Sequence, residues 1–230
     1  MSFKNVILKK YWENGEAIKH LRENGVPPAW MLTAYGKKLK KYSDDTIRTF
    51  GEKGKDQHNK NYVEEKMAKE GKEYCGKVKN IMAVTGPNVE KHIQVYLRSK
   101  FAQTMHIPEI NPWTYNHMHD LMKQYPEFYE NRVNLHFAPV QTFKVDDCKF
   151  VDLDLMQTYN EVRAAIQSWL EFQSLMVDGP KAFTYTAAIR KDGGSRKRFN
   201  NHVTLFKTLG ADLVSIDGQK GIFPSAKEYG

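Results

Sequence analysis

The sequence predicts an α+β protein with a mainly helical N-terminal half and a C-terminal half of short antiparallel strands packed on one long helix. Two observations lead to this fold class. Apolar residues recur with helical spacing up to about residue 125, and they alternate with polar residues in several short segments beyond residue 132. The predicted division is a helical basic region over 1–125 and an α+β region over 126–230, with one continuous domain as the alternative.

Three helices are predicted at the start of the chain, over residues 5–24, 29–41 and 44–50. Ile7 and Ile18 lie near one face of the first helix. The proline pair in VPPAW separates it from the second helix, because proline fixes φ and disfavours helix in the residue before it. Ser43 or Asp44 can cap the third helix. Residues 51–61 contain no aliphatic or aromatic side chain and predict a loop.

Two longer helical segments follow, over residues 62–84 and 88–105. The break between them is the segment TGPN. Val89, Ile93 and Leu97 form an apolar stripe on the second segment, which is typical of an amphipathic helix. Asn111 and Pro112 then predict the start of the last helix of this half, since proline is favoured just inside a capped amino end.

Short runs of alternating apolar and polar side chains predict strands over residues 132–137, 143–145 and 150–153. Asp146 and Asp147 lie where a hairpin turn would join two of these strands. Residues 155–176 return to helical spacing and predict the long helix of the second half. Residues 181–223 predict three or four further short strands.

The charge of the chain is unevenly distributed. The net charge of +8 divides into +9 over residues 1–100, −5 over 101–185 and +4 over 186–230. Basic ends around an acidic centre are typical of a protein that binds a polyanion or docks head to tail with a copy of itself. Solvated helix faces give the same layout without any partner.

The cellular setting follows from segments that the sequence lacks. No stretch approaches the roughly 18 apolar residues of a membrane-spanning helix, and the first residues do not resemble a signal peptide. Cys75 and Cys148 have no CxxC partner and predict reduced thiols, with one disulfide as the alternative. The expectation is an intracellular protein, or one inside an assembled particle, that is not secreted.

Two basic segments are candidate nucleic-acid interfaces. RKDGGSRKR is a glycine-rich loop between predicted strands, and arginine contacts phosphate with two parallel hydrogen bonds. Its basic residues are Arg190, Lys191, Arg196, Lys197 and Arg198. WMLTAYGKKLKKY mixes lysines with aromatic rings on which unpaired bases can stack. Its candidate residues are Trp30, Tyr35, Tyr42, Lys37, Lys38, Lys40 and Lys41. A solvated hairpin tip and a solvated helix face are the alternatives.

The segment HVTLF resembles one arm of the 2H phosphoesterase pattern, which is H-x-[ST] followed by apolar residues. By this resemblance His202 and Thr204 would form one catalytic pair, and His136 in HFAPV would be the second histidine. Ala138 stands where the second hydroxyl belongs. A strand with an inward valine and leucine explains HVTLF equally well.

No metal site and no cofactor are predicted. The segment HIPEINPWTYNHMHD gathers His106, Glu109, His117, His119 and Asp120. His117 and His119 are two apart on a predicted helix, so their side chains point in different directions. The chain also lacks the glycine-rich dinucleotide fingerprint, the P-loop and the nucleophile elbow.

These observations favour a structural protein over an enzyme. The predicted function is a viral nucleocapsid- or coat-like subunit that binds single-stranded nucleic acid, RNA or DNA, without sequence preference and associates with copies of itself. The alternatives are a 2H-like phosphodiesterase that uses His202, Thr204 and His136, and an accessory factor that binds another protein through the acidic centre.

Overall fold

The computed structural model describes residues 34–50, 57–87, 89–126 and 131–188 of the 230-residue chain. Their core is a five-stranded sheet with the strand order β3-β2-β1-β4-β5. Every neighbouring pair in this sheet is parallel. The strands are β1 Val78–Val84, β2 Ala102–Glu109, β3 Val133–Phe137, β4 Cys148–Thr158 and β5 Ala182–Ala188.

The predicted fold class is wrong, because the strands are parallel and two of them lie in the half that was predicted to be helical. The segment 62–84 is a helix only as far as Cys75, where α4 (Gln57–Cys75) ends, and it continues as β1. Parallel strands are buried on both faces and therefore read as continuous apolar runs, which periodicity cannot separate from a buried helix. Strands from both sides of residue 125 lie in this one sheet.

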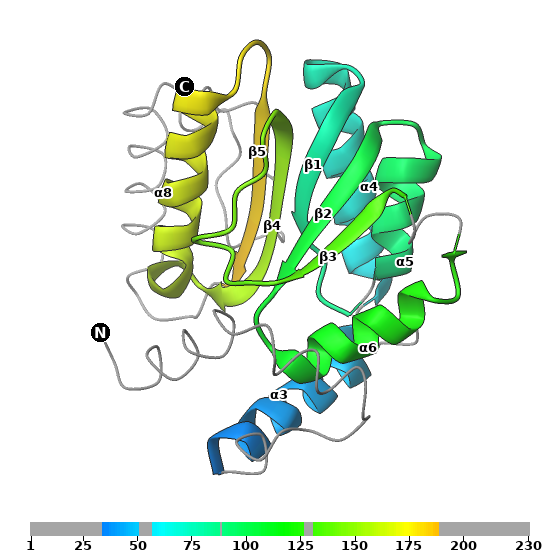
Figure 1. The fold of residues 1–230 in the computed structure, drawn as a ribbon, viewed down its shortest axis with the longest axis vertical. Helices are drawn as coiled ribbons and strands as arrows, with labels where there is room; N and C mark the ends of the chain where they lie inside the picture. Colours follow the sequence, from blue (N-terminus) through cyan, green and yellow to red (C-terminus); the bar gives the residue numbers. More distant parts are fainter. Residues whose placement is uncertain (1–33, 51–56, 88, 127–130, 189–230) are drawn as a thin grey trace.

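Helices cover both faces of the sheet (Figure 1). On one face lie α4 and the short α5 (Val89–His92), which continues as a π-helical turn over Ile93–Arg98. On the other face lies α8 (Tyr159–Met176). The long crossovers that parallel strands need place helices in these positions. The result is a doubly wound sheet, a class of α/β architecture.

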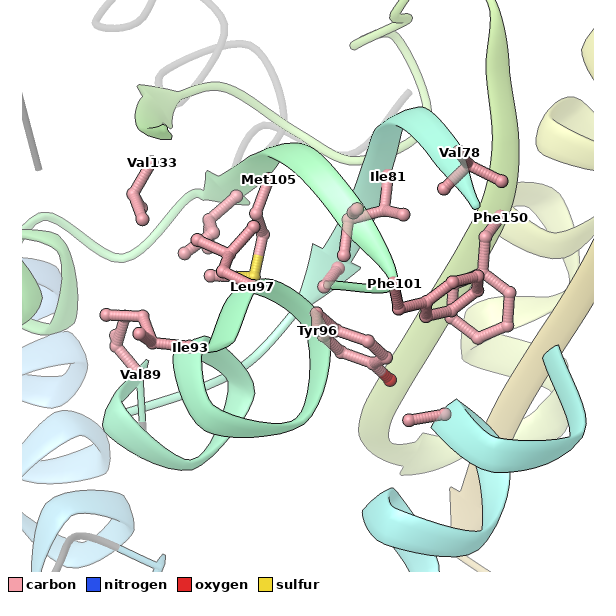
Figure 2. Close-up of a cluster of buried hydrophobic side chains, with 14 of the residues drawn as sticks. Val78, Ile81, Val89, Ile93, Tyr96, Leu97, Phe101, Met105, Val133 and Phe150 are labelled. Atoms are coloured by element: carbon pink, nitrogen blue, oxygen red, sulfur yellow. The ribbon is translucent and has the colours of Figure 1, made fainter. Parts of the chain in front are cut away.

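The larger part of the core lies between the sheet and the α4–α5 layer. Figure 2 shows Ile93, Tyr96 and Leu97 pointing toward the strands, where Met105 and Ile81 face them. The stripe predicted for residues 88–105 is therefore buried, with Ile93 and Leu97 at most 1% exposed. The helical conformation ends at Arg98, and the chain turns at Lys100 (φ 59°) into β2.

The hairpin predicted at Asp146 and Asp147 is also wrong. These residues belong to a connection from β3 to β4, two strands separated in the sheet by β2 and β1. The connection packs against α8, since the Trp169 indole N–H donates to the carbonyl oxygen of Val140 over 2.7 Å. Asp147 does adopt the left-handed conformation of a turn residue (φ 50°). The turn, however, belongs to a crossover between parallel strands and not to a hairpin.

Two helices lie together at the carboxyl end of the sheet, α3 (Ala34–Phe50) and α6 (Pro112–Met122) (Figure 1). The predicted start of α6 is confirmed: Pro112 is at the first turn, and Asn111 accepts a hydrogen bond from the Trp113 backbone N–H over 3.0 Å. The Asn111 amide also donates to the Leu39 carbonyl oxygen over 3.0 Å, so it ties α3 to α6. The Ser43 and Thr114 hydroxyls, 2.9 Å apart, form a second, buried tie.

Within the described ranges, no helix combines the length and the apolar composition needed to cross a membrane. Cys75 and Cys148 are both free thiols. Burial raises the pKa of the Cys148 thiol to about 12 and that of Cys75 to about 11, so both stay protonated at neutral pH.

Candidate functional site

The strand order defines a switch point between β1 and β4. The chain moves outward from β1 to β2 and β3, and then returns past β1 to β4 and β5. Crossover connections on the two sides of such a point leave the sheet in opposite directions and open a crevice outside the carboxyl ends of the central strands. Open α/β sheets bind their ligands in this crevice.

The turn after β1 lies at the carboxyl end of the sheet, beside this switch point. It runs through Thr85, Gly86 and Pro87 to α5, which starts at Val89. Gly86 has φ +57°, a conformation that glycine adopts without steric cost. The buried Thr85 hydroxyl donates to the Gly86 carbonyl oxygen over 2.9 Å, and Pro87 has no N–H to offer a ligand.

Glu109 also lies at this end of the sheet, because it is the last residue of β2, the strand next to β1. Its carboxylate oxygen Oε1 accepts a hydrogen bond from the Asn111 backbone N–H over 2.6 Å. Burial raises the pKa of this carboxyl to about 7, and the backbone N–H groups of Asn111 and Ile110 oppose that rise. At neutral pH the ionised form, which accepts hydrogen bonds, and the protonated form, which can also donate one, are therefore both populated.

Four buried polar side chains join three elements around the middle of β4: Glu64 of α4, His92 and Tyr96 of the α5 segment, and Asp152 of β4. The Tyr96 hydroxyl donates to Oδ2 of Asp152 over 2.5 Å, and the Thr184 hydroxyl of β5 donates to Oδ1 over 3.0 Å. Nε2 of His92 lies 3.5 Å from Glu64 and 3.9 Å from Asp152. We call this set the buried polar cluster.

The buried polar cluster is a structural tie. Burial, together with the negative charge of Asp152, raises the pKa of the Tyr96 phenol well above 10. The phenol therefore stays a hydrogen-bond donor at all ordinary pH values. Because Asp152 is 1% exposed, it stabilises the layer of α4 and α5 on the strands and does not face a ligand directly.

A second group of polar residues lies on the α8 face of the sheet. Nδ1 of His106 in β2 lies 3.2 Å from Nε2 of His136 in β3. Both rings pack against Phe143, with centroid distances of 6.5 and 4.3 Å. Partial burial lowers the pKa of both imidazoles, to about 4 for His136, where the proximity of His106 adds to the effect.

The predicted site residues fall into three groups. The lysines of the front patch, Lys37, Lys38, Lys40 and Lys41, are exposed on α3, and Tyr42 beside them is 51% exposed. Trp30, the arginine loop (190–198), His202 and Thr204 lie outside the described residues. His136 lies in the described part of the chain, and its ring contacts His106. By proximity in the sequence, His106 had been placed in a cluster with Glu109 and His117.

The histidine-rich segment does not converge on one point. His106 and Glu109 are three apart in β2 and point to opposite faces of the sheet, whereas His117, His119 and Asp120 belong to α6. In the part of the chain that the structure describes, no group of three or more His, Cys, Asp or Glu side chains could hold a metal ion.

The comparison with known proteins found similarity among solved structures alone. No family model and no curated protein sequence matches this chain. An N-methyltransferase, NodS from Bradyrhizobium japonicum WM9 with S-adenosyl-L-homocysteine, aligns at 8% identity over 74% of this chain and 85% of that one, with a TM-score of 0.49. A putative rRNA methylase from Clostridium thermocellum aligns at 14% identity over 67% and 86%, with a TM-score of 0.44.

A third solved structure is geranyl diphosphate C-methyltransferase from Streptomyces coelicolor A3(2), at 9% identity over 77% of this chain and 74% of that one, with a TM-score of 0.43. Likeness at this level concerns the course of the backbone, so no activity follows from it.

The predicted function is wrong in both of its forms. A nucleocapsid- or coat-like subunit was inferred from the uneven charge, the two basic segments and the missing catalytic motifs, but the described strands form one parallel sheet with helices on both faces (Figure 1). The phosphodiesterase alternative needed His136 as one of two facing catalytic arms, but His136 hydrogen-bonds to His106 of the adjacent parallel strand. The similar solved structures described above are methyltransferases, and none of them is a viral or coat protein.

Proposed function

We propose that this chain binds S-adenosylmethionine at the carboxyl ends of β1 and β2 and transfers its methyl group to an acceptor. The observation that carries the proposal is the position of Glu109. It ends the strand next to β1, at the switch point of a doubly wound sheet, 23 positions after Gly86 in the first turn. An acidic residue about 20 positions after this turn is the group that holds ribose hydroxyls in such folds.

The chemistry of the first turn favours a cofactor without phosphate groups. A dinucleotide places its pyrophosphate on a glycine-rich turn and the first N–H groups of the following helix. Here the turn has one glycine, Pro87 lacks an N–H, and α5 has only four residues before its geometry changes. S-adenosylmethionine keeps the adenosine but replaces the phosphates with a cationic sulfonium group, which needs no such cradle.

The residues present fit that cofactor. An ionised Glu109 is an acceptor for ribose hydroxyls, and the left-handed Gly86 lets the backbone approach a ligand closely. When bound, the cofactor supplies an electrophilic methyl group, which the acceptor's nucleophilic atom takes while its proton passes to a base or to water. The NodS N-methyltransferase and the geranyl diphosphate C-methyltransferase described above hold S-adenosyl-L-homocysteine, the corresponding product.

The test is an isothermal titration of the full chain with S-adenosylhomocysteine, NAD⁺ and ADP as separate probes. We expect one saturable site for S-adenosylhomocysteine, and binding of NAD⁺ and ADP at least 10-fold weaker, which is a difference of about 1.4 kcal/mol. Equal or tighter binding of NAD⁺, or no saturable site for S-adenosylhomocysteine, would contradict the proposal.

We further propose that the acceptor is a nucleic acid that lies along α3. The support is the place of this helix: α3 is tied to α6, which starts three residues after Glu109, so its lysines lie at the same end of the sheet. Exposed lysines and a half-exposed tyrosine on one helix can hold phosphates and stack a base. Self-association of the chain stays a prediction.

Replacement of Lys37, Lys38 and Lys41 by Glu is expected to weaken binding of single-stranded nucleic acid by at least 10-fold at low salt and to flatten its dependence on salt. The matched control makes the same charge change at Lys77, Lys79 and Lys100, which are exposed near the opposite end of the sheet. Fluorescence anisotropy over a series of salt concentrations measures both variants. Equal loss in the two would show that net charge, and not α3, governs binding.

A further inference from the structure

A pocket of about 450 Å³ lies on the α8 face of the sheet, under the connection from β3 to β4. It is lined by Asn80, Thr104, His106, His136, Phe143, Lys144, Val145 and Asp146. His106 and Glu109 alternate to opposite faces of β2, so this pocket is separate from the proposed cofactor site. The described residues that line it include two imidazoles and no thiol, and the proposed methyl transfer uses none of them.

The two imidazoles meet edge to edge. Their ring planes differ by 14°, their centroids are 5.4 Å apart, and Nδ1 of His106 is 3.2 Å from Nε2 of His136. Because the centroid distance exceeds the N···N distance by about the width of one ring, the rings lie nearly in one plane and share a single proton between facing nitrogens. Which nitrogen carries that proton depends on the tautomers.

The same spacing suits two ligands of one metal ion. A Zn–N bond of about 2.0–2.1 Å and a tetrahedral angle separate two ligand nitrogens by about 3.3–3.4 Å. The pair already holds this distance, within about 0.2 Å. The two nitrogens now face each other, so each ring has to rotate by roughly 35° for both lone pairs to converge on one tetrahedral ion, and the shared proton has to shift to the far nitrogen of one ring.

We propose that His106 and His136 bind one divalent transition-metal ion of the zinc, nickel or copper type in this pocket. Neutral imidazole is a preferred ligand of these ions, and the partial burial of both rings favours the neutral form. Phe143 packs against both rings and restricts their orientation. The remaining coordination positions face the pocket, where water completes the coordination and the side chains of Asn80 and Thr104 provide oxygen atoms that bind this water.

Lys144 also lines the pocket, but its positive charge points away from the two histidines, so it repels a bound metal ion only weakly. Its ammonium group donates to the Ser168 hydroxyl over 2.8 Å and to the Gln141 carbonyl oxygen over 3.3 Å. It also lies 4.3 Å from the centroid of the Trp169 ring on α8. The contacts with Ser168 and Trp169 hold the charge against α8, and burial lowers the pKa of this amine to about 8, which weakens the repulsion further at alkaline pH.

The test uses the full chain after treatment with a chelator, titrated with ZnCl₂ by calorimetry and with CoCl₂ by visible absorption. We expect one ion per chain and Co²⁺ bands typical of nitrogen and oxygen ligands. His106→Asn and His136→Asn should each weaken Zn²⁺ binding by at least 10-fold, and Zn²⁺ should raise the unfolding temperature of the parent more than that of either variant.

The matched control replaces His117 and His119, both on α6, by Asn and should leave Zn²⁺ binding unchanged. Circular dichroism of the metal-free variants shows whether they fold. If either single variant does not fold, His136→Gln provides the same removal of a ligand with a longer amide. Absence of a saturable Zn²⁺ site in the parent, or unchanged affinity in a folded His106→Asn or His136 variant, would overturn the proposal. These readouts do not depend on methyl transfer or on S-adenosylhomocysteine.

Discussion

Replacement of Asp152 by Ala is expected to lower the free energy of unfolding by about 3–5 kcal/mol, the cost of breaking a buried charged network by removing one partner. Asp152 is 1% exposed, and its two oxygens accept hydrogen bonds from Tyr96 of the α5 segment and Thr184 of β5. The variant leaves the buried Tyr96 hydroxyl without its Asp152 acceptor, and it removes one of the two acceptors of the Thr184 hydroxyl, the other being the Val151 carbonyl oxygen. Urea denaturation followed by circular dichroism measures the difference.

The matched control is Asp120→Ala, which removes an exposed carboxylate that pairs with Lys123 over 3.0 Å on α6. Exposed pairs of this kind contribute about 0–1 kcal/mol. Asp152→Asn keeps the shape and one acceptor oxygen and should fall between the two. A loss of less than about 1 kcal/mol for Asp152→Ala would mean that the buried polar cluster does not hold the layers together.

Replacement of Glu109 by Ala is expected to raise the dissociation constant of S-adenosylhomocysteine by about 10- to 150-fold, because hydrogen bonds to a charged group contribute roughly 1.5–3 kcal/mol. Titration calorimetry measures the change. Glu73→Ala is the control, since Glu73 is an exposed carboxylate near the end of α4, the end from which the chain enters β1. An affinity within about 2-fold of the parent for Glu109→Ala would contradict its proposed role.

Affinity for S-adenosylhomocysteine should also depend on pH through Glu109. Its pKa is about 7 without ligand, and hydroxyl groups that donate to the carboxylate favour the ionised form. Binding is therefore coupled to loss of a proton, so affinity is full above pH 7 and falls as the pH drops below 7. Glu109→Gln, which does not titrate, should show weaker binding with no such fall. The same pH dependence in parent and variant would assign it to another group.

The helices were predicted from the sequence more accurately than the sheet. The long helix predicted over 155–176 is present from Tyr159 to Met176, with Ile166 and Leu170 buried as expected. The start of α6 was also predicted, because Asn111 and Pro112 determine it by local capping chemistry. Such signals act within one turn of the chain, so a single sequence contains all that they need.

The parallel sheet could not be predicted in the same way. Val78–Val84 has four apolar residues in a row, which fit a buried strand and a buried helix equally. The residues around Lys100 gave no glycine or proline to mark the end of the helix before β2, although the chain turns there. Pairing of β1 with both β2 and β4 depends on contacts between residues more than 20 positions apart.

The candidate sites depend on that pairing. His106 and His136 are 30 positions apart and meet only because β2 and β3 are adjacent and in register. Glu109 reads as an ordinary polar residue until β2 is recognised and its last residue falls beside the turn at Gly86. Residues 78–92 form a strand, a turn and a helix, and recognising this unit in the sequence would have predicted the ligand-binding end of the sheet. The unit was not recognised because its turn lacks the glycine-rich fingerprint.

Hydrogen–deuterium exchange with and without S-adenosylhomocysteine tests most directly whether the carboxyl ends of the central strands hold the cofactor. We expect slower exchange in peptides that span the turn from β1 to α5 and the end of β2 through Asn111. Peptides around Gly76 and Lys100, at the opposite ends of β1 and β2, should not change. Slower exchange at those opposite ends, or in the α8 face pocket alone, would contradict the account.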